Sequence, residues 1–469
     1  MHTIDKLFEI EGNSQIFDFK IFNNQLHLWP LIRFQILVAA LYESNDIISE
    51  PDPLRINPSS VFPYLFNTYR YRSSRVKKSD VLFFGSNISN VKIEGIYFNR
   101  LSEHFANIFH SQATIIEESV NFTYRRPRTF KKVFTNDDIV IRSKISSKFV
   151  SLKKADLLTI DQFIDYLKNN FSYSFNDKFK WDKIKVLLIR VCKEFSTKYS
   201  LYKKLFQKVA PKIVFIECAS YGYGYIPAIL AAKKMGIKVV EYQHGLVSLN
   251  HPAYNFHPEI SSEYLRYMPD FFLTYGQYWK DNCRLPVPMV LIGNPYLSEI
   301  LEKTYHSVKR NQFLYASGAV DPELTVRQAF YLKDLLKPYG YNLVFRPHPS
   351  ELNRLENVYK PIIEKGIQVD RQKLYDTLKE SKFVFSDFST VLLEALAFGC
   401  TPVVLKTSGS EAYLNYHDIV FINKIEDLSE YLVKHEDKSY NTEKLWERNW
   451  KANFRSFIIN KCNYQTKTL

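Results

Sequence analysis

Cysteine is scarce in this chain and follows no pattern that would build a site. The five cysteines are scattered, odd in number and never spaced as CxxC; they are Cys192, Cys218, Cys283, Cys400 and Cys462. A disulfide framework or a zinc site would need such spacing. We therefore expect neither, and no metal ion is expected to take part in the protein's function.

Long apolar runs are also missing. The N-terminus carries charges from its fifth residue onward and has no long apolar core, so neither a signal peptide nor a transit peptide is visible. The most apolar early stretch, residues 28–41, is interrupted by Arg33 and Gln35 and is too short to span a bilayer. These absences predict a cytoplasmic protein.

Common cofactor and hydrolase motifs are absent too. The chain has no Walker loop, no HExxH and no GxSxG sequence. Gly222 and Gly224 follow an apolar run, but Pro227 stands where a dinucleotide fingerprint needs its third glycine. No NAD, FAD or other cofactor is therefore expected.

What the chain does contain is enough apolar material for more than one core. It has 469 residues, of which 46% are hydrophobic and 16% aromatic. Such a chain folds, and its length makes two domains the natural expectation. The formal net charge is +14, which favours a nucleic acid, an anionic lipid surface or an anionic substrate as a partner.

The positive charge gathers in two clusters in the first third of the chain. They comprise Arg70, Arg72, Arg75, Lys77 and Lys78, and then Arg125, Arg126, Arg128, Lys131 and Lys132. Neither cluster lies in a nucleic-acid-binding signature, so we expect no nucleic-acid partner. A basic face on an anionic inner membrane, or facing a lipid-diphosphate acceptor, fits better. A solvated face of a basic protein is the alternative.

Strand-like and helix-like stretches alternate along the chain, as is typical of parallel-sheet α/β domains. In the first half, strands are expected at 81–84, 213–216 and 238–242, with a helix at 226–235. In the second half, strands are expected at 313–315, 343–345, 383–385 and 402–405, with helices at 323–336, 373–380 and 391–398. The pattern predicts two doubly wound, Rossmann-like domains.

The turn residues Gly293-Asn294-Pro295 mark the expected boundary between these domains. We expect one domain at 1–295, with a mixed insertion around 121–199, and a second at 296–430. The remaining segment, 431–469, is expected to be helical and to pack back on the first domain. Two facing domains would place the carboxyl ends of both sheets at a central cleft, where ligands of such sheets bind.

The sharpest local motif is Arg346-Pro347-His348-Pro349-Ser350-Glu351, directly after an expected strand. Prolines on both sides of His348 restrict the backbone and hold the imidazole at a strand end. With Arg346 it can hydrogen-bond a nucleotide phosphate or protonate the departing phosphate oxygen. A turn histidine satisfied by backbone is the alternative. After another strand, Ser317-Gly318 offers a backbone nest for phosphate.

A second motif, Ser386-Asp387-Phe388-Ser389-Thr390, leads into an apolar helix. Ser389 or Thr390 is a normal helix cap, and hydroxyls with free N–H groups at a helix start also suit an anion. Glu394 lies one turn further along, where its carboxylate can accept hydrogen bonds from a ribose diol. An exposed helical glutamate is the alternative.

A third motif, Gln243-His244-Gly245, ends the βαβ unit of the first half. Gly245 permits a tight turn, and His244 at the rim of the cleft can take a proton from an acceptor hydroxyl. A loop or core histidine is the alternative.

From residue 213 to residue 405 the chain resembles the bacterial capsule and lipopolysaccharide glycosyltransferases that use CMP-activated sugars, such as sialic acid and Kdo transferases. More distantly it resembles the CDP-glycerol glycerophosphotransferases of teichoic acid synthesis. Those enzymes share a His-Pro motif and a Ser/Thr motif that hold the cytidine nucleotide, matched here by His348-Pro349 and by Ser386 with Ser389-Thr390. The resemblance implies the GT-B fold, with the acceptor on the first domain and the nucleotide sugar on the second.

The chain departs from this pattern where the CMP-sugar transferases carry a catalytic carboxylate, because it has His244 there. A histidine suits a general base in inverting transfer, not a carboxylate nucleophile. Retaining GT-B enzymes that use UDP- or GDP-sugars resemble the stretch 394–402 but have a second glutamate at the position of Ser386, which favours a cytidine donor. CDP-glycerol transfer, UDP- or GDP-sugar transfer, sugar-nucleotide 2-epimerisation and a non-catalytic glycan-binding role remain the alternatives.

Overall fold

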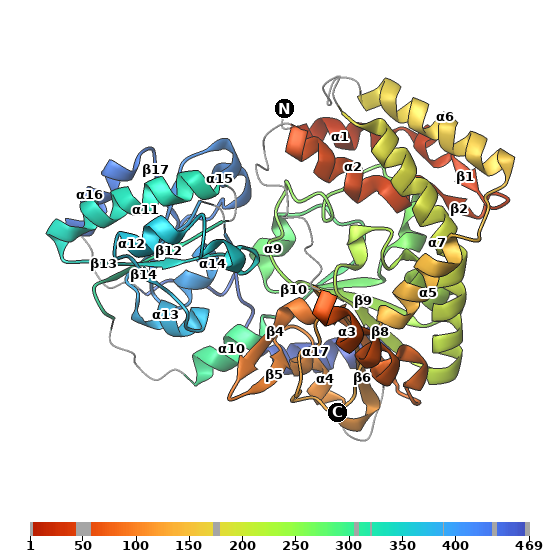
Figure 1. The fold of residues 1–469 in the computed structure, drawn as a ribbon, viewed down its shortest axis with the longest axis horizontal. Helices are drawn as coiled ribbons and strands as arrows, with labels where there is room; N and C mark the ends of the chain where they lie inside the picture. The colour runs from red at the N-terminus through yellow and green to blue at the C-terminus, as the bar shows by residue number, and fades with distance from the viewer. Residues whose placement is uncertain are drawn as a thin grey trace.

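The computed structural model of the protein describes residues 3–43, 58–171, 179–303, 309–318, 321–387, 389–433 and 439–464. These residues form two parallel β-sheets, one in each half of the chain, each surrounded by helices (Figure 1). Two short antiparallel hairpins, β1–β2 (Lys20–Ile21, Leu26–His27) and β4–β5 (Asn90–Ile93, Ile96–Asn99), stand apart from them.

The first sheet has seven strands in the order β11-β10-β9-β8-β3-β6-β7. They are β3 Val81–Ser86, β6 Ala113–Glu118, β7 Val133–Thr135, β8 Ile213–Ile216, β9 Lys238–Tyr242, β10 Phe271–Thr274 and β11 Met289–Leu291. Phe84 of the central strand β3 pairs with Ile116 on one side and Ile216 on the other. Strand β8 is buried along its whole length, which explains its unbroken apolar sequence.

The second sheet has six strands in the order β14-β13-β12-β15-β16-β17. They are β12 Gln312–Ala316, β13 Asn342–Arg346, β14 Gln368–Val369, β15 Phe383–Phe385, β16 Thr401–Leu405 and β17 Val420–Ile422. All neighbouring strands are parallel, and Tyr315 of β12 lies between Phe345 of β13 and Phe385 of β15.

Both sheets have Rossmann-like strand order. In the second sheet, the chain moves from β12 outward through β13 to β14, and then restarts on the other side of β12 with β15. In the first sheet, the same reversal falls between β3 and β8. Ligands of open parallel sheets bind beyond the carboxyl ends of the strands at such a switch point. The predicted α/β class, with the two Rossmann-like domains of a GT-B protein, is confirmed.

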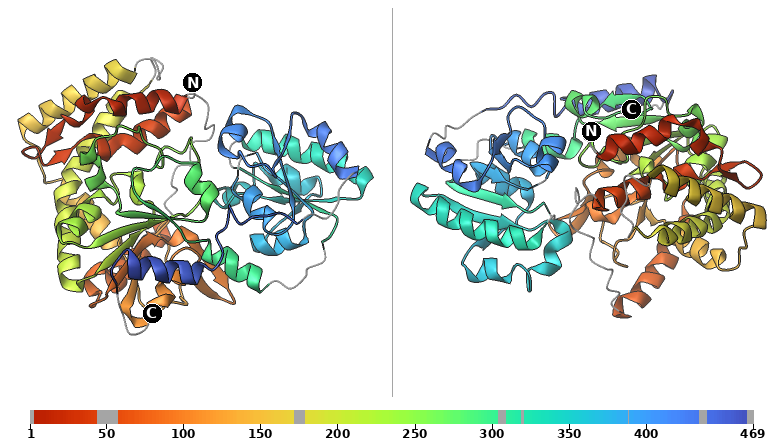
Figure 2. Two further views of the ribbon diagram at one scale, coloured as in Figure 1. Left: turned by 180° about the vertical axis from the view of Figure 1, so that it is seen from behind. Right: turned by 90° about the horizontal axis from the view of Figure 1, so that it is seen from above.

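Helices cover the sheets and connect their strands (Figures 1 and 2). In the first half they are α1 Thr3–Gly12, α2 Trp29–Glu43, α3 Pro58–Tyr71, α4 Glu103–Ile108, α5 Asp137–Ser147, α6 Lys154–Phe171, α7 Trp181–Val209, α8 Ile226–Lys234, α9 Gln277–Asp281 and α10 Pro295–Glu302. In the second half they are α11 Pro322–Leu336, α12 Lys360–Glu364, α13 Leu374–Glu380, α14 Val391–Leu396, α15 Ser408–Tyr413, α16 Leu428–Val433 and α17 Trp450–Asn460.

In its described residues, the stretch 121–199, expected to be a mixed insertion, contains strand β7, helices α5 and α6 and most of helix α7. Strand β7 is the edge strand of the first sheet, and α5 and α6 pack against the long helix α7. Leu188 and Cys192 of α7 are fully buried in the largest apolar core of the chain. Much of this stretch is therefore an integral part of the first domain.

After the second sheet the chain returns to the first domain. The backbone of Lys444 crosses so close to Gly276 that a Cβ at Gly276 would lie 2.5 Å from the Lys444 carbonyl oxygen. Helix α17 then packs on the first sheet, where the Phe454 and Phe105 ring centroids are 4.5 Å apart. The backbone at Lys444 and helix α17 thus pack on the first domain, while the Tyr440 hydroxyl before them lies 3.0 Å from the hydroxyl of Thr401 in the second domain.

None of the helices in the described ranges combines the length and the apolar character that crossing a bilayer requires.

Candidate functional site

The carboxyl edge of the second sheet carries one serine on each side of its switch point. Ser317 directly follows β12, and Ser386 directly follows β15, the strand beside it. Both are buried, and the Ser386 hydroxyl has no hydrogen-bond partner among the described residues. A buried hydroxyl without a partner is costly, so an incoming acceptor such as a phosphate oxygen would satisfy it. Gly318 is half-buried beside Ser317.

Glu351 fixes the His348 loop against the end of β12. Its carboxylate accepts hydrogen bonds from the backbone N–H of His348 at 3.3 Å and from Ser317 Oγ at 2.6 Å. The Tyr359 hydroxyl donates to it as well, also at 2.6 Å, and Glu351 is 1% exposed. The buried Glu351 carboxylate therefore joins the loop of Ser317 to the loop of His348. The sequence motif contains Glu351 but does not predict this role.

His348 itself stays exposed at this edge. Nearby protein atoms lower the pKa of His348 by desolvation, while the charge of Glu351 acts in the opposite direction. A neutral imidazole can donate one hydrogen bond to a phosphate, and the anion would in turn favour its protonation. Pro349 begins the 3₁₀ helix Pro349–Arg354 and is also exposed.

Arg346 is held by Asp370. Its guanidinium pairs with the Asp370 carboxylate and donates to the carbonyl of Gln372 at 3.0 Å. Its charge nevertheless acts on Glu394. The direct phosphate contact expected from the sequence would require Arg346 to share its guanidinium with Asp370, so its present part is structural and electrostatic.

The start of α14 presents two hydroxyls. Ser389 Oγ accepts a hydrogen bond from the backbone N–H of Val391 at 3.2 Å, as a helix cap does. The Thr390 hydroxyl instead hydrogen-bonds Glu394 on the next turn. Because α14 has only six residues, its dipole contributes little, and any anion here would depend on these hydroxyls and the local N–H groups.

Glu394 faces the interior. It is 9% exposed, hydrogen-bonds Tyr375 and Thr390, and has its pKa raised by burial. Tyr375 in turn contacts Tyr296 of α10, with ring centroids 5.5 Å apart. The alternative of an exposed helical glutamate is therefore wrong, and Glu394 lies where the second domain approaches the first.

Arg100 lies at this approach and interacts with both domains. Its charge acts on Tyr375 and Glu394 of the second domain. It also acts on Glu217 and His244 at the carboxyl edge of the first sheet. The charge of Arg100 therefore acts on the carboxyl edges of both sheets.

Glu217 occupies the switch point of the first sheet. It directly follows β8, and its Oε2 accepts a hydrogen bond from the backbone N–H of Ser86, at the end of β3, at 3.0 Å. Gly85 leaves room for it, since a Cβ there would lie 2.6 Å from Oε2. Burial raises the pKa of Glu217 to about 7. A carboxylate with such a pKa is poised for proton transfer near neutral pH.

His244 lies among aromatic side chains and next to Cys218. Its Nε2 is 3.3 Å from the Tyr221 hydroxyl, and its Nδ1 is 3.3 Å from the Tyr254 hydroxyl. Cys218, the residue after Glu217, places its Sγ 3.6 Å from Nε2. Burial and, to a smaller extent, the charge of Arg100 together lower the pKa of His244 to about 4. The imidazole is therefore neutral at pH 7 but a weak base.

Glu241, near the end of β9, is a second buried acid at the carboxyl edge of the first sheet. It accepts hydrogen bonds from the Ser220 N–H at 3.0 Å and from the Tyr254 hydroxyl at 3.2 Å. Burial raises the pKa of Glu241 to about 8. Tyr254 thus connects Glu241 with His244 in one hydrogen-bonded group.

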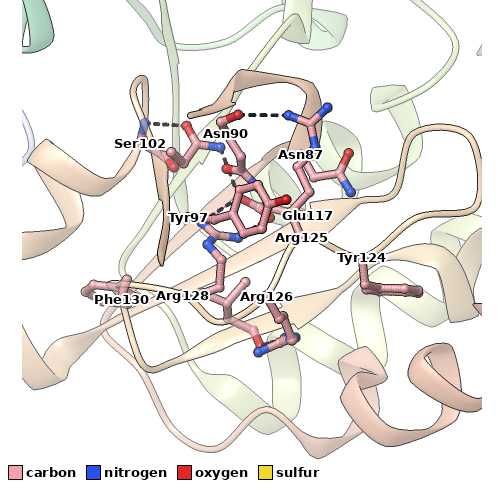
Figure 3. Close-up of polar contacts among 12 residues, drawn as sticks. Asn87, Asn90, Tyr97, Ser102, Glu117, Tyr124, Arg125, Arg126, Arg128 and Phe130 are labelled. Carbon is pink, nitrogen blue, oxygen red and sulfur yellow. Dashed lines mark hydrogen bonds and ion pairs between the residues drawn. The ribbon is translucent and has the colours of Figure 1, made fainter. Parts of the chain in front are cut away.

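The arginines of one predicted basic cluster bond to neighbouring groups of the first domain (Figure 3). The side chain of Arg128 is 3% exposed and pairs with both Glu103 and Glu117. Arg125 donates to the carbonyl of Asn90 at 2.8 Å, and Arg126 to that of Val133 at 2.8 Å. Arg128 is therefore removed from the predicted basic face at 125–132, whereas Arg125 and Arg126 are half-buried and Lys131 and Lys132 are exposed.

The predicted site residues thus fall into two groups, one at the carboxyl edge of each sheet. Ser317 and His348 share Glu351, while Thr390 and Glu394 hydrogen-bond each other, and Arg346 acts on Glu394 by charge. His244 belongs to the other sheet and is related to Glu394 through Arg100. Sequence reasoning missed Glu217 and Arg100. A glutamate directly after a fully apolar strand was the available signal for Glu217.

Comparison with known proteins gives no family. No protein-family model matches the chain, and no curated protein is significantly similar in sequence.

Among solved structures, UDP-GlcNAc 2-epimerase from Methanocaldococcus jannaschii aligns with 14% identity over 82% of this chain and 99% of its own, with a TM-score of 0.46. A putative UDP-N-acetylglucosamine 2-epimerase from Listeria monocytogenes aligns with 13% identity over 83% and 98%, with a TM-score of 0.48. A UDP-forming trehalose-phosphate synthase from Burkholderia vietnamiensis aligns with 11% identity over 82% and 98%, with a TM-score of 0.41. A likeness of this degree does not indicate a substrate or a reaction.

Proposed function

We propose that this chain is a glycosyltransferase that moves a sugar from a cytidine-nucleotide donor to a surface polysaccharide or lipid-linked glycan. The preferred donor is a CMP-activated acidic sugar of the Kdo or nonulosonic type. The observation that supports this best is that two unlike switch points both interact electrostatically with Arg100. One offers hydroxyls and an imidazole, and the other offers titratable groups.

The second domain would hold the donor. The unpartnered hydroxyl of Ser386 and the exposed imidazole of His348 would bind the phosphate, with Ser389 and Thr390 supplying further donors. Glu394 would accept hydrogen bonds from the ribose diol, as its present bonds to Tyr375 and Thr390 indicate an acceptor role. Arg100 would contribute positive charge from the first domain when an anionic donor occupies the space beside Glu394.

The first domain would supply the general base. His244 is the base expected from the sequence, and Glu217 is a second candidate because its pKa of about 7 matches the pH of the cytoplasm better than the pKa of about 4 of His244. In an inverting transfer the acceptor hydroxyl attacks the anomeric carbon while the bond to the phosphate oxygen breaks. The base takes the hydroxyl proton, and the nucleotide leaves with the bonding electron pair, its new charge stabilised by His348.

A nucleotide panel tests this proposal. Thermal-shift measurements with CMP, CDP, UDP and GDP should show the largest stabilisation with a cytidine nucleotide, because only ligands that bind the folded state raise the melting temperature. Purified protein incubated with CMP-Kdo, a CMP-nonulosonic acid or CDP-glycerol and a glycan acceptor should then release CMP from one donor.

Each alternative has its own result in that experiment. CMP release from CDP-glycerol alone would identify a glycerophosphotransferase. Preference for UDP or GDP would point to a transferase of another donor class, and conversion of a UDP-sugar without acceptor would identify an epimerase. The absence of affinity for all four nucleotides would identify a non-catalytic glycan-binding protein.

A further inference from the structure

Helix α3, Pro58–Tyr71, carries an apolar face that points away from the protein. Its exposed large side chains are Val61 at 38%, Phe62 at 79%, Leu65 at 50%, Phe66 at 53% and Tyr69 at 63%. The spacing i, i+1, i+4, i+5, i+8 places all five on one side of a helix. Contiguous exposed apolar surface of this kind marks an interaction site.

The opposite face of α3 anchors the helix to the first domain. Tyr64 is 9% exposed and Thr68 is 6% exposed. The Tyr64 and Phe122 ring centroids are 4.9 Å apart, and the Thr68 and Tyr124 hydroxyls are 2.8 Å apart. In the view from above, the orange-red helix of residues 58–71 projects from the body of the domain (Figure 2). The apolar face is thus held outward by specific packing.

Positive charge surrounds the C-terminal end of this face. Residues 58–79 contain five lysines and arginines and no aspartate or glutamate. Arg70, Arg75, Lys77 and Lys78 are exposed. The guanidinium carbon of Arg72 lies 4.2 Å from the Tyr69 ring centroid, and that of Arg75 lies 5.4 Å from it. The cations therefore lie beside the apolar stripe, where an anionic surface could meet both.

We infer that α3 is a membrane-docking helix that inserts its apolar face between the lipids of an anionic bilayer. An apolar stripe with basic residues beside it is the composition of helices that lie in a membrane interface, with aromatic side chains among the acyl chains and cations at the head groups. Because residues 58–79 contain no aspartate or glutamate, an anionic lipid surface fits this face better than a basic protein surface does. This inference concerns a different surface from the proposed donor and acceptor groups and does not depend on the transfer reaction.

Vesicle flotation with the full chain tests the inference. The probes are vesicles of phosphatidylcholine alone and vesicles with about 30% phosphatidylglycerol, a fraction at which several nearby lysines and arginines add up to strong attraction. The wild type should float with the anionic vesicles at low salt and bind at least about tenfold more weakly to the neutral ones. Phe62→Ser combined with Phe66→Ser should reduce binding to anionic vesicles by at least about tenfold, because the buried apolar area is lost.

The matched control is Phe149→Ser, which removes an equally exposed phenylalanine, 84% exposed, from another part of the surface. This variant should bind like the wild type. Lys77→Gln combined with Lys78→Gln should weaken binding to anionic vesicles and leave the residual binding to neutral vesicles unchanged. Light scattering after gel filtration on every variant reports the oligomeric state.

Three results would overturn the inference. The first is no flotation of the wild type, and the second is equal loss of binding in the Phe149 variant and the Phe62/Phe66 variant. The third is a dimer that dissociates in the Phe62/Phe66 variant, which would make a second copy the occupant of this face. Nucleotide binding measured on the same variants should not change, so failure here is distinguishable from failure of the proposed function.

Discussion

The two sheets share one strand order and differ in what they place at the switch point. The second sheet ends in the hydroxyls of Ser317 and Ser386, and Glu351 joins the His348 loop to Ser317. The first ends in Glu217, with Glu241 and His244 nearby, and its acids have pKa values raised by burial. One edge is suited to hold an anion, and the other is suited to exchange a proton. The same topology thus provides two positions whose chemistry is set by a few side chains.

Under the proposed function, each domain supplies what the other lacks. An anion-binding edge alone would bind a nucleotide without reacting, and a titratable edge alone would have no activated substrate. Arg100 relates the two edges electrostatically. Its charge acts on Glu394 of the second domain and on Glu217 and His244 of the first. The following changes separate the two roles.

The largest effect is expected from His348→Ala. This change removes the imidazole that is proposed to contact the phosphate and should lower kcat/KM for transfer by about a hundred- to a thousandfold, the scale of losing one preorganised donor to a developing charge. Thermal unfolding should be unchanged, because the side chain is exposed. His417→Ala, an exposed histidine elsewhere in the same domain, is the control and should behave as wild type. Normal turnover by the His348 variant would refute its role.

A smaller loss, about a hundredfold, is expected when the base is removed from the first sheet. The pH profile tells which residue it is. If Glu217 is the base, kcat/KM rises as the pH passes about 7, and Glu217→Gln removes that rise. If His244 is the base, the profile is flat between pH 5 and 8, since its pKa is about 4, and His244→Gln gives the loss instead.

The acids of the first sheet should make stability fall as the pH rises. In the folded protein the pKa of Glu241 is about 8, whereas the ordinary pKa of a glutamate is 4.5. Protonated Glu241 therefore stabilises the fold fully below pH 4.5, and this contribution is lost as the pH rises toward 8. Urea unfolding between pH 5 and 7 should show a slope that Glu241→Gln reduces by up to about 1.4 kcal/mol per pH unit. An unchanged slope would show that Glu241 is ionised in the folded state.

The smallest effect belongs to Ser386→Ala. Because the hydroxyl is buried without a partner, its removal should leave the free energy of unfolding unchanged or slightly higher. Affinity for the nucleotide should nevertheless fall by about five- to tenfold, the value of one hydrogen bond. Isothermal titration with CMP measures it. A variant that is less stable but binds normally would make Ser386 a packing residue only.

Local patterns predicted sheet-forming elements in both domains. Buried parallel strands have continuous apolar sequences, so β15 and β9 lie at the residues expected, and Gly236 ends α8 with a φ of 72°. The motif around His348 was found because proline restricts the backbone locally. Spacing alone could not predict whether Glu394 is buried or exposed.

Other parts of the site depend on contacts between distant segments. Glu217 acquires its environment from Ser86, 131 residues earlier, and Arg100 meets Glu394 only because the two domains approach. Arg128 counted as a surface charge in the sequence and is buried between two glutamates in the structure. The outward apolar face of α3 reverses the usual orientation of such a stripe, so periodicity alone did not reveal it.

The most direct test of the account is a crystal structure of the protein with cytidine monophosphate. The account predicts that the phosphate lies at the carboxyl edge of the second sheet, within hydrogen-bond distance of His348 and of a hydroxyl from Ser386, Ser389 or Thr390. A phosphate lodged at the first sheet, or a nucleotide bound away from both switch points, would contradict it.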